Sequence, residues 1–152
     1  MQEEKNESEL TPLDKELHRL IDTVPEVPYS AFPLERPQFF FVSGRNVEKL
    51  TGYSAAEIYA NKELWTNMIH PDDREQVFAA FAKCKSKGVG FEIEYRITHK
   101  DGSVRYVIDK GEPVFNDKGE ITQIEGIITD VSKQKQVEDV QLPKTIPKAT
   151  KP

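Results

Sequence analysis

The first third of the chain contains one segment with helical spacing and two segments typical of strands. Thr11 is suited to an N-cap and Pro12 to the first helical position, so the spacing predicts a helix over residues 11–24. The apolar positions that form one stripe on this helix are Leu13, Leu17, Leu20 and Ile21. Two short aromatic-rich runs, residues 28–35 and 37–43, then meet at a turn-prone Glu-Arg-Pro sequence and predict two strands.

Helical signals dominate the middle of the chain. Ser54 followed by Glu57 forms a capping box, and His70 with Pro71 marks the start of a longer helix that ends at Gly88. The apolar face expected for this longer helix consists of Val77, Phe78, Phe81 and Cys84. This region therefore predicts several helices between the first two strands and the rest of the chain.

The last third predicts three long strands joined by tight turns. Residues 91–98 alternate between apolar and polar side chains, and an Asp101-Gly102 turn leads into a second alternating run. A further strand follows the turn-forming residues 116–119 and ends near Asp130. We predict an α+β domain in which an antiparallel sheet packs helices on one face.

Length and composition limit the possible organisation and partners. The 152 residues suffice for one domain, the mean hydropathy is −0.61, and no apolar run approaches the roughly 20 residues that cross a bilayer. One cysteine permits no internal disulfide, and the polar acidic N-terminus is unlike a signal peptide, so a cytoplasmic protein is expected. The net charge of −5 argues against nucleic acid as a partner. The predicted regions are a disordered N-terminus (1–10), the amphipathic helix (11–24), the domain (25–132), and an exit helix with an unstructured tail (133–152).

Three stretches, in order, resemble the PAS family of sensory domains. These are VEKLTGYSAAEI, WTNMIHPDDREQV, and the long segment from FEIEYRITHKDGSVRYV to EGIITDVSKQKQVED. The second resembles a subgroup found in bacterial and archaeal signalling kinases, and the third resembles the C-terminal PAC-type motif. The resemblance implies a five-stranded antiparallel sheet with helices on one face, and a sensor or interaction module, not an enzyme.

Other chemistries are less well supported by the residues. Gly44-Arg45-Asn46 matches the start of a flavin-binding photoreceptor box, but it lacks the cysteine and precedes the TGYS segment. We interpret it as a strand-to-helix turn in which Gly44 can adopt positive φ and Asn46 caps a helix. Cys84 is expected to fill the core as a free thiol. Neither flavin nor haem is expected as a cofactor.

Metal binding and phosphotransfer also lack the residues that they need. The three histidines are His18, His70 and His99, and no two of them have a metal-ligand spacing. Neither His18 nor His70 has the adjacent acid of a phosphoacceptor histidine, and no glycine-rich ATP-binding segment is present. We predict no metal site and no catalytic residues in this sequence.

The predicted interior between sheet and helices is the candidate ligand site. Its expected lining residues are Phe40, Leu50, Ile58, Trp65, Ile69, Val77, Phe81, Phe91, Ile93, Tyr95, Tyr106, Ile108 and Ile127. The aromatic content is equally compatible with a filled core, so the interior either is packed or holds a small non-covalent ligand.

The end of the last predicted strand is the candidate signalling junction. Asp130 and Ser132 can cap the exit helix, and the family resemblance implies a basic partner for the acid, for which Arg105 is the candidate. The alternative is a plain helix cap without a switching role.

The predicted function is signal input, through a small ligand or a protein partner, passed on by the flanking helices. The leucine stripe predicts a homodimer. The chain can act as a module with a signalling partner, or as a segment of a larger sensor kinase or cyclase; a flavin or haem sensor is the less favoured alternative.

Overall fold

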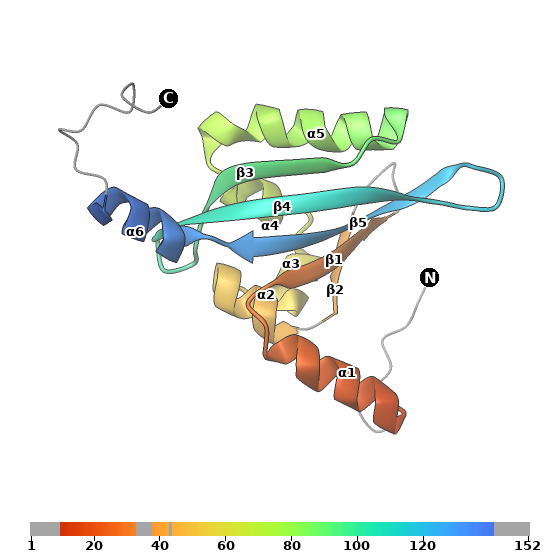
Figure 1. The fold of residues 1–152 in the computed structure, drawn as a ribbon, viewed down its shortest axis with the longest axis horizontal. Coiled ribbons are helices and arrows are strands. Elements are labelled where there is room, and N and C mark those ends of the chain that lie inside the picture. Colours follow the sequence, from red (N-terminus) through yellow and green to blue (C-terminus); the bar gives the residue numbers. More distant parts are fainter. Residues whose placement is uncertain (1–9, 33–37, 43, 142–152) are drawn as a thin grey trace.

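Five antiparallel strands form one sheet in the structure, a computed structural model that describes residues 10–32, 38–42 and 44–141 (Figure 1). The strands are β1 (Val27–Phe32), β2 (Gln38–Phe41), β3 (Phe91–Thr98), β4 (Val104–Phe115) and β5 (Ile121–Asp130). Their order across the sheet is β2-β1-β5-β4-β3. The expectations for residues 1–9, 33–37, 43 and 142–152 lie outside the described residues.

Helices lie between β2 and β3 in the chain and at its two described ends, and those between the strands pack on one face of the sheet. They are α1 (Pro12–Asp22), α2 (Gly44–Thr51), α3 (Ala55–Ala60), α4 (Leu64–Met68), the 3₁₀ helix η2 (Pro71–Asp73), α5 (Arg74–Lys87) and α6 (Ser132–Gln141). Figure 1 shows α5 running along β3 and β4, while α1 and α6 project from the domain. The predicted α+β fold with an N-terminal amphipathic helix is confirmed. Within the described ranges, no helix is both long and apolar enough to cross a membrane.

Local hydrogen bonds explain where the helices begin and end. Thr11 forms a capping box with Asp14, and Ser54 forms one with Glu57. Nδ1 of His70 accepts a hydrogen bond of 3.1 Å from the backbone N–H of Asp72, so this histidine caps η2 as expected. Gly88 ends α5 with φ of 66°, a left-handed conformation that glycine adopts without strain.

The segment at Gly44 and Asn46 differs from the predicted turn. Helix α2 already begins at Gly44, whose φ is not positive, and Asn46 lies inside the helix. The buried Asn46 amide donates hydrogen bonds to the carbonyls of Ile21 (2.8 Å) and Glu26 (3.0 Å). Asn46 therefore does not cap its own helix. Its hydrogen bonds hold the end of α1 and the residue before β1 against α2.

Four of the residues expected in the interior lie on the opposite face of the sheet. These are Phe40, Tyr106, Ile108 and Ile127. Val107 and Asp109 are fully buried on β4, so the residues between and beside them point outward. On β5 the buried residues are Ile124 and Ile128, while Ile127 is 46% exposed.

The same alternation places Phe40 outside. It pairs with Ser30, whereas Tyr29 and Ala31 on β1 are buried. The prediction was wrong because these strands carry large apolar residues on both faces, and their buried face includes Asp109, Gly111 and Gly126. A Cβ atom at Gly126 would lie 2.5 Å from the Tyr29 ring, so glycine there makes room for the ring.

Candidate functional site

A buried carboxylate lies at the centre of the sheet's inner face. Asp109 on β4 is fully buried, and its two oxygens accept hydrogen bonds from the hydroxyls of Tyr29 (2.7 Å) and Tyr95 (2.8 Å). The three residues come from strands β4, β1 and β3. Because both oxygens have donors, the group avoids the large cost of an unpaired buried charge.

Burial also changes how these groups ionise. It raises the pKa of Asp109 to about 6, although the hydrogen bonds from Tyr29 and Tyr95 oppose part of this rise. Burial and the adjacent carboxylate raise the pKa of both tyrosines well above the ordinary value. Asp109 therefore titrates close to neutral pH, while the tyrosines remain protonated donors.

The sequence pattern alone did not indicate this network. A single acid between Ile108 and Lys110 is typical of a solvent-facing strand position, and only the register shows that it points inward. Apolar residues on β4 occupy positions of both faces, as Val107 and Ile108 do. The sequence pattern therefore did not show which face is buried.

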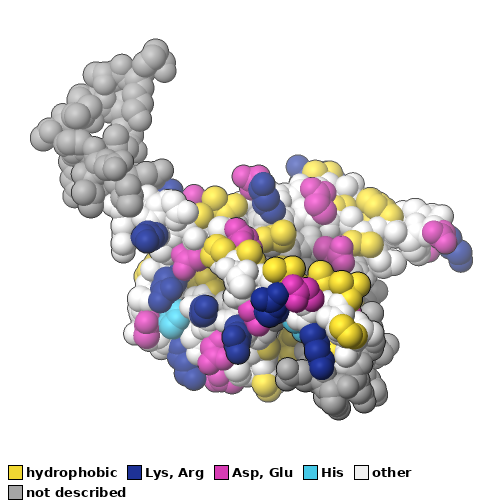
Figure 2. Space-filling model, turned by 60° about the horizontal axis from the view of Figure 1, so that its bottom comes forward, with side chains coloured by type: hydrophobic (Ala, Val, Ile, Leu, Met, Phe, Trp, Pro, Cys, Tyr) yellow, Lys and Arg dark blue, Asp and Glu magenta, His cyan; other side chains and the backbone are white. Residues whose placement is uncertain are grey.

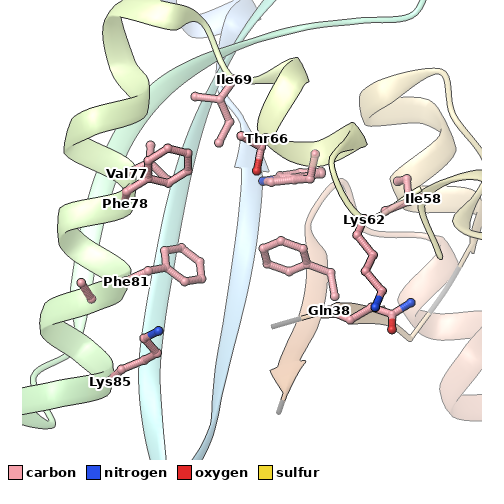
Figure 3. A pocket seen from close by; sticks show the side chains of 12 residues that line it. Gln38, Ile58, Lys62, Thr66, Ile69, Val77, Phe78, Phe81 and Lys85 are labelled. Atoms are coloured by element: carbon pink, nitrogen blue, oxygen red, sulfur yellow. The ribbon is translucent and has the colours of Figure 1, made fainter. Parts of the chain in front are cut away.

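Trp65 connects the buried network to a cavity. The Trp65 side chain lies close enough to the Tyr95 hydroxyl to lower its pKa, although burial raises that pKa overall. Trp65 also lines a cavity of about 300 Å³ between α5 on one side and α3, α4 and β2 on the other (Figure 3). The lining residues are Gln38, Phe39, Ile58, Lys62, Trp65, Thr66, Ile69, Val77, Phe78, Phe81, Ala82 and Lys85.

Aromatic rings form much of the cavity wall. The Phe39 ring centroid lies 5.3 Å from that of Trp65 and 6.1 Å from that of Phe81. Phe78, which was expected in the core, is 48% exposed and borders the cavity instead. The structure thus leaves open space between rings that would otherwise fill the core.

The predicted pocket residues divide into three groups. Those that line the cavity are Ile58, Trp65, Ile69, Val77 and Phe81. Those that pack in the core around it are Leu50, Phe91, Ile93 and Tyr95. The third group, described above, faces outward on the opposite side of the sheet. The prediction also omitted residues that do line the cavity, including Phe39, Lys62 and Lys85.

The residues at the cavity do not fit a covalently attached flavin or a coordinated haem. Neither Cys84 nor any of the three histidines belongs to the lining, and burial raises the pKa of the Cys84 thiol, which opposes thiolate formation. His70 and His99 instead accept backbone hydrogen bonds. The described residues contain no group of three or more metal-ligating side chains.

An ion pair anchors the first turn before α5, which forms one wall of the cavity. The carboxylate of Asp73 accepts hydrogen bonds from the backbone N–H and the guanidinium of Arg96 on β3, at 2.8–2.9 Å. These bonds lower the pKa of Asp73. Asp73 therefore holds the helix layer on the sheet.

The predicted signalling residues meet at the start of α6. Arg105 lies 3.5 Å from Asp130, and Asp130 accepts a hydrogen bond of 2.9 Å from the N–H of Ser132. The Ser132 hydroxyl in turn accepts a bond of 2.8 Å from the N–H of Tyr106. The expected contacts are thus present, whereas their role in signalling stays a prediction.

Helix α1 leaves its apolar stripe uncovered. Leu13, Leu17 and Leu20 are exposed by 67%, 48% and 50%, and no residue of α1 is buried. Figure 2 shows the face of the molecule that lies at the bottom of Figure 1, where hydrophobic side chains form a band beside a highly charged area. Three of the four predicted dimerisation residues are therefore exposed, whereas Ile21 is partly buried.

Comparison with known families identifies the fold. A family model described as the PAS fold matches residues 39–128, more than half of the chain. The chain belongs to the PAS family. The PAS resemblance of the sequence motifs is therefore confirmed.

Similar proteins are sensors and signalling enzymes. The methyl sulfide methyltransferase-associated sensor of Methanosarcina acetivorans is 38% identical over 103 residues, which are 67% of this chain and 10% of that protein. A sensory box histidine kinase/response regulator from Burkholderia thailandensis E264 is 25% identical, with a TM-score of 0.63 over 82% of this chain and 91% of that one.

A second solved structure is the N-terminal domain of a diguanylate cyclase with PAS/PAC sensor from Marinobacter aquaeolei. It is 27% identical, with a TM-score of 0.64 over 72% of this chain and 98% of that one. The prediction of a sensory PAS module is confirmed by these relatives. The chain spans about a tenth of the length of the Methanosarcina protein.

Proposed function

We propose that this PAS module binds a small molecule in the cavity beside α5 and passes its occupancy to an output domain through the flanking helices. The observation that carries the proposal is the cavity of about 300 Å³ in the sheet–helix interior, with apolar and aromatic walls. Its wall residue Trp65 also lies beside Tyr95, which belongs to the buried network that joins three strands. A ligand beside Trp65 can therefore shift the population of sheet conformations.

The path to the output is supported by a second cleft, of about 350 Å³. It is lined by the end of α1, by α2 residues that include Asn46, and by Arg105 and Asp130. The connections that enter and leave the domain therefore meet at one place. A change in the Arg105–Asp130 contact alters the population of α6 positions, and α1 can respond through the same cleft.

The exposed stripe of α1 supports a homodimer. An isolated amphipathic helix of this length is marginal in water, and burying Leu13, Leu17 and Leu20 against a second copy would stabilise it. In sedimentation experiments, Leu17→Glu should shift the dimer toward monomer, while Lys15→Glu, an exposed change on the same helix, should not. A monomeric wild type at high concentration would contradict this part.

The similar proteins named as kinase and cyclase support a covalently linked output domain for this module. In this proposal the module itself catalyses no reaction and works in the cytoplasm, as its single, buried cysteine suits a reducing compartment.

Native mass spectrometry together with an absorption spectrum of the purified protein tests the proposed input. We expect a bound colourless small molecule, and slower hydrogen exchange at the start of α6 when it is present than after its removal. A flavin or haem band would overturn the proposal, and so would a ligand whose removal leaves exchange in α6 unchanged.

A further inference from the structure

Aromatic rings from three separate elements meet at the cavity. Phe39 lies on β2, Trp65 on α4 and Phe81 on α5, and all three line the open space. The Phe39 ring stands at 81° to that of Phe81 and at 48° to that of Trp65. Figure 3 shows Phe81 directed from α5 into the cavity. The wall therefore offers ring faces and ring edges in several directions.

The size of the cavity suits a small ring system. Its volume is about 300 Å³, whereas a cavity of about 150 Å³ with aliphatic and aromatic walls takes one benzene ring. The rest of the lining includes the aliphatic residues Ile58, Ile69 and Val77. Because aromatic pairs favour edge-to-face and offset contacts at centroid distances of about 4.5–7 Å, a flat ligand can contact several wall rings at once.

The Thr66 hydroxyl is an uncharged polar group on the same wall. Thr66 follows Trp65 on α4, and Figure 3 shows its oxygen directed toward the cavity. Among the described residues this hydroxyl has no hydrogen-bond partner. The amide of Gln38, another lining residue, instead donates to the carbonyl of Tyr59 (3.3 Å). The Thr66 hydroxyl is therefore accessible to a ligand, and it can donate or accept a hydrogen bond.

We propose that the cavity takes an uncharged aromatic molecule, with one or two fused rings and a hydroxyl or N–H group. This inference rests on the proposed function, since it names the ligand class of the same cavity. The ligand's rings lie among Phe39, Trp65 and Phe81, and its polar group bonds to the Thr66 hydroxyl. A cation is disfavoured because none of the described lining residues is acidic, so a buried positive charge has no counterion there.

Three uncharged probes test the two parts of this assignment. They are 2-naphthol, decahydro-2-naphthol, which has the same skeleton without aromatic rings, and naphthalene, which lacks the hydroxyl. Binding is followed by the side-chain N–H resonance of Trp65, the single tryptophan of the chain. We expect 2-naphthol to bind about threefold to tenfold more tightly than decahydro-2-naphthol, because ring contacts add to the burial of apolar area. It should bind about fivefold more tightly than naphthalene because of the hydrogen bond.

A matched pair of threonine variants tests the polar contact. Thr66→Val keeps the shape of the side chain but removes the hydroxyl, so 2-naphthol should lose its advantage over naphthalene while naphthalene binds as before. Thr98→Val is the control, because Thr98 is exposed on β3 and does not line the cavity.

A matched pair of phenylalanine variants tests the ring contact. Phe81→Leu keeps an apolar side chain on the wall but removes a ring, so the preference for 2-naphthol over decahydro-2-naphthol should fall. Phe115→Leu is the control, because it removes a ring that is 52% exposed and lies outside the cavity.

The outcomes separate the ligand class from the site itself. Equal binding of 2-naphthol and decahydro-2-naphthol to the wild type would overturn the aromatic class and leave the cavity as an input site. Equal losses in a variant and its control would overturn the contact assigned to Thr66 or Phe81. A Trp65 resonance that none of the three probes shifts would overturn the proposed function as well.

Discussion

The two ends of the protein's interior are built in opposite ways. Around Asp109 the space is filled, and a buried charge has a hydrogen-bond donor on each oxygen. Around Phe39 and Phe81 the space is open, and aromatic and aliphatic side chains form most of the described walls. Trp65 belongs to both ends, since it lines the cavity and lies beside Tyr95.

This difference indicates a division of roles. A fully satisfied polar network fixes the register of three strands, because any shift leaves a buried charge without partners. An apolar cavity tolerates different contents, because dispersion and burial do not require one geometry. The closed end therefore supports the fold, and the open end can adapt to a ligand.

Removing the buried acid should have the largest effect. Asp109→Ala leaves two buried tyrosine hydroxyls without an acceptor and should lower the free energy of unfolding by about 3–5 kcal/mol, measured by urea denaturation. Lys110→Ala, at the exposed neighbouring position, should change it by less than about 0.5 kcal/mol. Similar losses in both variants would show that the closed end does not depend on this network.

The pH dependence of the free energy of unfolding tests the burial of the same carboxylate, Asp109. The pKa of Asp109 is about 6 in the folded protein against an ordinary 3.8, so the folded state holds the proton more tightly. Its ionisation therefore weakens the fold as pH rises from about 4 through 6, by about 3 kcal/mol, and the loss is constant above that range.

Asp109→Asn isolates this contribution because asparagine does not titrate. The stability of the wild type minus that of the variant should fall between pH 4 and pH 7. A difference that stays constant across this range would contradict the raised pKa of Asp109.

The anchor of α5 should have a smaller effect. A double-mutant cycle with Asp73→Ala and Arg96→Ala should give a coupling free energy of about 1–2 kcal/mol at neutral pH, since the pair is only partly exposed. The lowered pKa of Asp73 means that this stabilisation is present above its unfolded pKa and is lost on acidification.

The same variants should loosen the wall of the cavity. Cys84, buried on α5, should react faster with a thiol reagent when either partner is removed. The control pair is Lys100 and Glu57, which are 53% and 46% exposed and 3.3 Å apart. A coupling as large in this control, or no change in Cys84 labelling, would speak against an anchoring role.

The exit junction should show the smallest change in global stability, below about 1 kcal/mol. Asp130→Asn weakens the attraction to Arg105, and Arg105→Ala removes it, so hydrogen exchange at residues 132–136 should become faster in both. Glu125→Gln, an exposed change on the same strand, should leave it unaltered. Unchanged exchange in both junction variants would leave Asp130 as a plain helix cap.

The accuracy of the predictions followed the regularity of each strand. On β3, Glu92 and Glu94 alternate with Ile93 and Tyr95, so one face is clearly apolar and its inward direction was predicted correctly. On β4, Val107 and Ile108 place an apolar residue on each face. Because Asp109 is charged, its face was predicted to be exposed, and this prediction was wrong. The contact between Arg105 and Asp130 was expected from the family resemblance, whereas the anchor at Asp73 and the cavity residues Lys62 and Lys85 were not expected.

The sequence by itself determined the helix starts, the hairpin turns and the family, because these depend on residues within a few positions of one another. The capping boxes at Thr11 and Ser54 each join residues three positions apart. Only the tertiary structure decided which face of β4 and β5 is buried and where the cavity lies. The Tyr29–Asp109 hydrogen bond joins residues 80 positions apart, and no local pattern records that contact.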